Sequence, residues 1–181
     1  MGVGLSYIYT LPDVGVLVLI NPEILTGLVV IFTLSFLLHE IAHKLSAQHY
    51  GLWAEFRLTL WGAIITLVSM LPFPFFKIIS PGAVMIAGSV TEKEVGKTAL
   101  AGPLTNIAIS TICTTVLIVT QNTFYGAIPF FGAWINAIIA VFNLIPFGIM
   151  DGLKVFQWNK LVWTAAFIAS LVLTVYVFVF V

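Results

Sequence analysis

The sequence predicts an integral membrane protein: a mainly α-helical, polytopic bundle of about four to six transmembrane helices with a small β element near the cytoplasmic side. Of its 181 residues, 61% are hydrophobic and 8% are charged, whereas soluble domains carry about 25% charged residues. Several apolar runs also approach the roughly 20 residues that a helix needs to cross about 30 Å of hydrocarbon. We expect a single domain over 1–181, with its core at 23–155 and no appended soluble domain.

Apolar segments predict the membrane helices in chain order. Those that qualify or nearly qualify are about 23–47, 98–120, 130–147 and 161–181. Residues 3–20 are also apolar, but Pro12 and Asp13 interrupt them, so a further span there stays open. Thr91 and Glu94 match the S/T-x-x-E capping box, which predicts that a helix begins near residue 91.

The region 52–90 has a different pattern and predicts strands together with a short membrane element. Apolar and polar residues alternate over Phe56–Leu60, as in a strand. The apolar run 61–71 is short for a span and is followed by prolines. A Pro-Gly pair at 81–82 lies between two β-prone runs and predicts a hairpin. The number of spans in 1–20 and 58–90 is left open.

The charges predict how the bundle lies in its membrane. With the four helices above, all seven basic residues fall on one side, in the segments 44–97 and 148–160. The positive-inside rule makes that side cytoplasmic. Because long extracytoplasmic loops are absent, we expect a multi-pass protein of a prokaryotic cell membrane. The formal net charge is zero, which offers no phosphate-binding surface, so we expect no nucleic-acid partner.

The motif His39-Glu40-Ile41-Ala42-His43 places three ionisable side chains in the first apolar segment. Residues four apart on a helix lie about 40° apart around the axis and about 6 Å apart along it. His39 and His43 can therefore bind one metal ion, as in H-E-x-x-H zinc sites. Glu40 would lie beside the ion, where it can take a proton from the water that zinc activates.

Chance occurrence or helix packing could also explain a lone H-E-x-x-H motif. Against this, charged groups at the bilayer centre cost about 2.5–3.5 kcal/mol each, so they are rarely without a function. His49 lies about 120° away from the face of the two histidines, which favours a role at the helix end over metal binding. The motif therefore predicts a site for one Zn²⁺ ion.

A catalytic zinc needs three protein ligands and an open position. Among the remaining acidic residues, Asp151 alone follows an apolar helix that is interrupted within its length, by Pro146. Gly148 and Gly152 permit unusual backbone angles or close packing there. Taken alone, Asp151 fits better as a cap of the next helix near Lys154. Cys113 is the only cysteine, which excludes an internal disulfide and a cysteine metal site.

Three motifs occur in order on successive hydrophobic segments: HEIAH (39–43), AGPLTN (101–106) and FNLIPFGIMDG (142–152). Together they resemble the site-2 protease family of intramembrane zinc metalloproteases over roughly 30–155. The residues that carry the two later motifs are Gly102, Pro103 and Asn106, then Asn143, Pro146, Asp151 and Gly152. The chain departs from the family in lacking a further proline before Asp-Gly, and in the extra apolar run 61–71.

The resemblance implies an assignment of roles. His39, His43 and Asp151 would be the zinc ligands, and Glu40 the general base. Asn143 would help to hold the substrate or the oxyanion, with an interhelical hydrogen bond as the equal alternative. The residues expected to give structural support rather than chemistry are Gly102, Pro103, Asn106, Pro146 and Gly152.

The implied reaction is hydrolysis of a peptide bond within or next to a transmembrane helix of another membrane protein. The partners would be that protein and the lipid bilayer, and the oligomeric state is left open. The segment Phe56–Leu60 could pair with a locally unwound substrate by strand addition. Because the motif lies close to Lys44, the site should be nearer the cytoplasmic face. The alternatives are a membrane metal transporter or metal sensor using the same His/Asp site, and a membrane scaffold.

Overall fold

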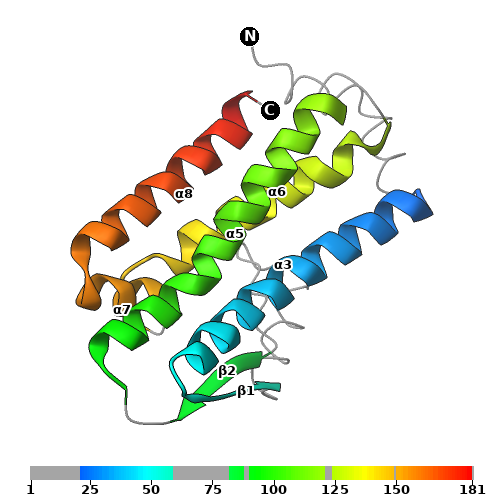
Figure 1. The fold of residues 1–181 in the computed structure, drawn as a ribbon. Coiled ribbons are helices and arrows are strands. Elements are labelled where there is room, and N and C mark those ends of the chain that lie inside the picture. The colour runs from blue at the N-terminus through cyan, green and yellow to red at the C-terminus, as the bar shows by residue number, and fades with distance from the viewer. Residues whose placement is uncertain (1–20, 59–81, 88–89, 121–123, 149, 181) are drawn as a thin grey trace.

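Long helices laid side by side dominate the computed structural model (Figure 1). It describes residues 21–58, 82–87, 90–120, 124–148 and 150–180. In chain order the elements are α3 (Pro22–His49), β1 (Trp53–Leu58), β2 (Gly82–Ala87), α5 (Glu92–Thr120), η1 (Phe124–Gly126), α6 (Ala127–Asn143), α7 (Asp151–Trp158) and α8 (Lys160–Phe180). Helix α5 is central, because it packs against α3, α6, α7 and α8.

Three of the described helices, α3, α5 and α8, are long and apolar enough to cross a membrane. Helix α6 is also apolar but has 17 residues, which at 1.5 Å per residue extend about 26 Å. The predicted class of a helical membrane protein is therefore confirmed in its broad form. The open span at 3–20 and the run 61–71 lie outside the described residues.

Side chains cap the starts of α3 and α5. Before α3, the Asn21 side chain accepts hydrogen bonds from the backbone N–H groups of Glu23 and Ile24. Before α5, the backbone N–H of Thr91 donates to the Glu94 carboxylate at 2.8 Å, and the Glu94 N–H donates to the Thr91 hydroxyl at 3.3 Å. These two bonds are the reciprocal pair of a capping box, so the predicted helix start near residue 91 is confirmed.

Helix α6 ends earlier than the predicted segment 130–147, at Asn143. The reason is Pro146, which lacks an N–H and disfavours helical angles in the residue before it. Gly148 follows with φ +61°, in the left-handed region that favours glycine. The chain then forms α7, a short helix within 148–160, a segment that the apolar pattern had left between two membrane helices.

The described strands form a two-stranded antiparallel sheet in which Trp53 lies opposite Ala87 and Leu58 opposite Gly82. Strand β1 agrees with the strand predicted around Phe56–Leu60, although it begins earlier. Strand β2 begins at the glycine of the Pro-Gly pair and pairs with β1. The first half of the predicted hairpin lies outside the described residues. The sheet packs against α3.

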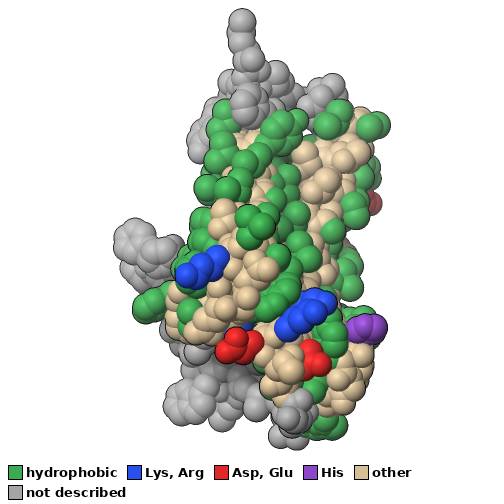
Figure 2. All heavy atoms as spheres, turned by 60° about the vertical axis from the view of Figure 1, so that its left-hand side comes forward, with side chains coloured by type: hydrophobic (Ala, Val, Ile, Leu, Met, Phe, Trp, Pro, Cys, Tyr) green, Lys and Arg blue, Asp and Glu red, His purple; other side chains and the backbone are tan. Residues whose placement is uncertain are grey.

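Polar and charged groups mark the two ends of the bundle. On the face shown in Figure 2, charged side chains gather mainly towards the lower end. The basic residues of the described part lie at one end of the bundle, the end that carries the sheet and α7. They are Lys44, Arg57, Lys93, Lys97, Lys154 and Lys160. At the opposite end, the Tyr125 hydroxyl donates to the Glu23 carboxylate at 2.9 Å, and this contact raises the pKa of Tyr125.

Candidate metal centre

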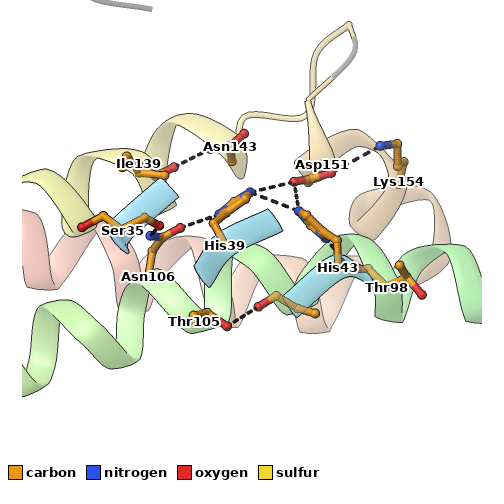
Figure 3. A network of polar contacts seen from close by, with 11 residues as sticks. Ser35, His39, His43, Thr98, Thr105, Asn106, Ile139, Asn143, Asp151 and Lys154 are labelled. Carbon is orange, nitrogen blue, oxygen red and sulfur yellow. Dashed lines mark hydrogen bonds and ion pairs between the residues drawn. The ribbon is translucent and has the colours of Figure 1, made fainter. Parts of the chain in front are cut away.

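The helical spacing brings His39 and His43 to one buried face of α3, where they are 4% and 8% exposed. Their Nε2 atoms lie 3.0 Å apart. The Oδ2 atom of Asp151, at the start of α7, lies 3.5 Å from His39 Nε2 and 3.0 Å from His43 Nε2. Figure 3 shows the three side chains converging from α3 and α7. Among the described residues, this is the one cluster of three or more His, Cys, Asp or Glu side chains that could hold a metal ion.

These separations fit a tetrahedral metal. With bonds of about 2.0–2.2 Å to nitrogen and oxygen, the edges of a zinc tetrahedron measure about 3.3–3.6 Å. The His39–Asp151 separation of 3.5 Å lies in that range, and the other two, both 3.0 Å, are slightly shorter. The donor set of two imidazoles and one carboxylate is also the one found in catalytic zinc sites. The residues present therefore fit a zinc ion with one open position.

Hydrogen bonds on the far side of each ring determine the tautomers. His43 Nδ1 donates to the Thr98 carbonyl at 2.7 Å, since a carbonyl oxygen can only accept. His39 Nδ1 donates to the Asn106 side-chain oxygen at 2.5 Å. In neutral rings both Nε2 atoms then carry lone pairs and no proton. Two lone pairs and a carboxylate oxygen facing one point repel each other unless a cation lies between them.

Asp151 is the first residue of α7 but does not cap it, because the N-cap is Met150 and no side-chain cap hydrogen bond forms. Its Oδ1 atom accepts from Lys154 Nζ at 3.3 Å. Its Oδ2 atom faces the two histidines. As a metal ligand this carboxylate would be ionised.

A close backbone approach brings Asp151 to α3. A Cβ atom at Gly152 would lie 2.1 Å from the Leu144 carbonyl oxygen, so only glycine allows α7 to begin against the end of α6. From α8, the Trp163 indole N–H donates to the same carbonyl at 2.8 Å. Leu144 itself is fully buried. The break at Pro146 thus produces a compact turn, which explains the support expected from Pro146 and Gly152.

Gly102, for which only a packing role was expected, lies directly beside the two histidines of the metal centre. A Cβ atom at this position would lie 2.4 Å from His43 Nε2 and 2.6 Å from His39 Nε2. These distances are near the 2.0–2.1 Å of zinc–nitrogen bonds, so a side chain here would occupy the space of the ion. Pro103 and Asn106, on the same helix, are fully buried as expected. Asn106 also holds His39, which packing alone did not predict.

The other residues of interest lie around this cluster. Glu40 is half-buried and is not one of the three clustered residues. The Asn143 amide donates to the Ile139 carbonyl of its own helix at 3.0 Å. His49 is exposed at the end of α3, with its ring against Tyr50, which agrees with the role expected for it at the helix end.

Three further residues of the site were not singled out from the sequence: Ser35, Thr98 and Asn136. Thr98 acts through its backbone carbonyl, which no side-chain pattern reveals. Ser35 and Asn136 are fully buried and join Asn106 in one hydrogen-bonded group. The signal in the sequence was a lone amide in the apolar run WINAIIAVF, since buried amides in membrane helices require partners.

Comparison with known proteins agrees with this centre. A protein of Methanocaldococcus jannaschii named "Putative zinc metalloprotease MJ0611" is 35% identical to this chain over 161 residues, which are 88% of this chain and 81% of that protein. The chain therefore belongs to the family of this protein. No family model matches the chain, and no solved structure gives a significant match.

Proposed function

We propose that this protein is an intramembrane zinc endopeptidase of the site-2 protease type, which hydrolyses a peptide bond within or next to a transmembrane helix of a membrane protein. The observation that carries the proposal is the buried convergence of His39, His43 and Asp151 inside a bundle of membrane-length helices. The kinship with a zinc metalloprotease supports zinc as the ion and proteolysis as the reaction.

In this proposal His39, His43 and Asp151 hold one Zn²⁺ ion. The bound ion would supply a Lewis acid that polarises the scissile carbonyl and acidifies the attacking water. Glu40 accepts the proton of that water and returns it to the leaving nitrogen as the bond breaks. Asn143 has a second amide N–H beyond the one that binds Ile139, which could donate to the substrate carbonyl.

The depth of the site supports a membrane-embedded substrate. His43 lies six residues before the end of α3 at His49, which is about 9 Å along the helix. The cluster would then lie inside the hydrocarbon but in the half nearer the end of α3 that carries Lys44. Water has a short path from that end, so a polar inlet there is sufficient for hydrolysis.

The test uses Glu40→Gln and Asp151→Ala in purified, reconstituted protein, with His49→Ala as the matched control. The substrate is a reporter protein whose single transmembrane helix carries a helix-breaking Asn-Pro pair. We expect Glu40→Gln to keep its zinc, measured by metal analysis, and to lose at least about a hundredfold in cleavage rate, because only the base is removed. Asp151→Ala should lose both zinc and cleavage, and His49→Ala should lose neither.

Other results would point elsewhere. Cleavage by Glu40→Gln would contradict the mechanism, and cleavage of soluble peptides without cleavage of the reporter would contradict the intramembrane site. A metal transporter using the same residues would move Zn²⁺ into vesicles and would not cleave the reporter.

A further inference from the structure

The two histidines of the metal centre are oriented by different means. His43 is held by a backbone carbonyl, that of Thr98, whose position in α5 is set by the helix itself. His39 is held by a side chain, Asn106. A primary amide can rotate by 180° and present either its oxygen or its nitrogen, so it determines the proton on His39 only if something fixes the amide.

The partners of Asn106 fix its orientation. Its Nδ2 atom lies 3.1 Å from the Ser35 backbone carbonyl, which can only accept a hydrogen bond. The nitrogen must therefore face α3 at Ser35, and the oxygen must face His39 Nδ1. The second hydrogen of Nδ2 is donated to the Asn136 side-chain oxygen at 2.7 Å.

Asn136, on α6, has its orientation fixed in the same way. Its Nδ2 atom donates to the Gly132 backbone carbonyl at 2.8 Å and to the Ser35 hydroxyl oxygen at 2.7 Å. The Ser35 hydroxyl in turn donates to the Ile31 carbonyl at 2.6 Å. Only the oxygen of Asn136 remains to face Asn106. Each member of the chain thus has one arrangement that satisfies all of its partners.

Because this chain of hydrogen bonds is buried, reversing one of its amides would cost considerable free energy. Ser35, Asn106 and Asn136 are all fully buried, and no water would be at hand in a membrane interior to replace a lost partner. Reversing Asn106 would place its nitrogen against His39 Nδ1 and its oxygen against the Ser35 carbonyl. His39 would then lose the Nδ1 proton, and the proton would move to Nε2, where it blocks metal binding.

We propose that Asn136 and Ser35 are positioning residues of the metal centre: through Asn106 they hold His39 in the tautomer that leaves Nε2 free for the metal. The inference rests on the metal site of the proposed function. Outer partners of this kind typically change metal affinity by about 10–100-fold when they are removed. If Asn136 only linked α5 to α6, the loss of any buried hydrogen bond between these helices should change zinc affinity equally.

Ser110 provides the matched control. It is also fully buried, and its hydroxyl on α5 donates to the Ala133 carbonyl on α6 at 2.7 Å. It therefore joins the same two helices without touching the chain that leads to His39. Ser110→Ala removes one buried interhelical hydrogen bond, whereas Asn136→Ala removes two, to Asn106 and to Ser35. Thermal unfolding of the metal-free variants measures how much stability each one loses.

The experiment measures zinc affinity by competition with a chelator and the visible absorption spectrum of the Co²⁺-loaded protein. We expect Asn136→Ala to lower zinc affinity about 10–100-fold and to alter the cobalt spectrum. Ser110→Ala should keep both within about twofold of the unmodified protein, whatever it does to the unfolding temperature. Equal zinc affinity in Asn136→Ala and the unmodified protein would overturn the proposal.

A double-mutant cycle tests the route through Asn106. If Asn136 acts only by orienting Asn106, the pair Asn106→Ala with Asn136→Ala should bind zinc no more weakly than Asn106→Ala alone. Additive losses would contradict this route. If Asn136→Ala does not fold, Ser35→Ala takes its place, because it removes one acceptor of Asn136 and leaves the Ser35 carbonyl. It should lower zinc affinity more than Ser110→Ala, and equal affinities would count against the proposal. Failure of the unmodified protein to bind zinc would instead contradict the proposed function itself.

Discussion

At the scale of single residues, the metal centre depends on the missing side chain of Gly102 as well as on its three ligands. The ligands follow from chemistry that a sequence displays directly: histidines four apart and a carboxylate beyond a helix break. The space between them depends on Gly102, where the lack of a side chain leaves room beside both Nε2 atoms. A glycine in an apolar helix reads as a packing residue, because a sequence does not show what the missing Cβ would have touched.

Gly102→Ala is therefore expected to exclude the metal. Its methyl group would lie 2.4 Å and 2.6 Å from the two Nε2 atoms, and overpacking costs about 1–3 kcal/mol, or about a fivefold to 150-fold loss of zinc affinity. Gly27→Ala is the control, since its Cβ would meet the side chain of Ile128 and no site residue. Zinc titration of both variants checks this, and full zinc affinity in Gly102→Ala would show that the ion lies elsewhere.

At the scale of elements, the segment between α6 and α7 carries Asp151 to the histidines. Hydropathy located the break at Pro146 but not the course of the chain after it. That course depends on contacts between backbones, namely the approach of Gly152 to Leu144 and the bond from Trp163 to the Leu144 carbonyl. Neither contact leaves a periodic pattern. The position of α7 against α6 was accordingly not predicted, whereas the capping box of α5 was, because its signal is local.

The indole bond from α8 should stabilise this segment measurably. Trp163→Phe keeps an aromatic ring next to Phe156 and Phe167 but removes the N–H that binds the Leu144 carbonyl. Losing one hydrogen bond of about 1 kcal/mol should weaken zinc binding about fivefold, because Asp151 is then held less firmly. Phe167→Leu, which alters the stack and keeps the N–H, should have no such effect on zinc affinity. Equal zinc affinities in the two variants would argue against a role for the indole bond.

At the scale of the whole molecule, hydropathy predicts which segments are helices but not which helices touch. His43 and Asp151 are more than a hundred residues apart, and they meet because α5 packs against both α3 and α7. The resemblance to a family, rather than the periodicity of this chain, was what paired Asp151 with the histidines in advance. The distribution of charge is also a property of the whole chain. It predicts which end of the bundle faces the cytoplasm, which the packing of the helices does not reveal.

The metal centre, the sheet and α7 should face the cytoplasm, because the basic residues gather at that end and the positive-inside rule places them there. Single-cysteine proteins test this in membrane vesicles, in a Cys113→Ala background and with a maleimide that does not cross bilayers. Lys93→Cys and Tyr125→Cys are both exposed positions at opposite ends of the bundle. Lys93→Cys should be labelled at least about tenfold faster in inverted vesicles, since only there does its end face the reagent, and Tyr125→Cys should show the opposite preference. The reverse result would place the metal centre nearer the extracytoplasmic face, and substrates would then have to be sought among proteins cleaved on that side.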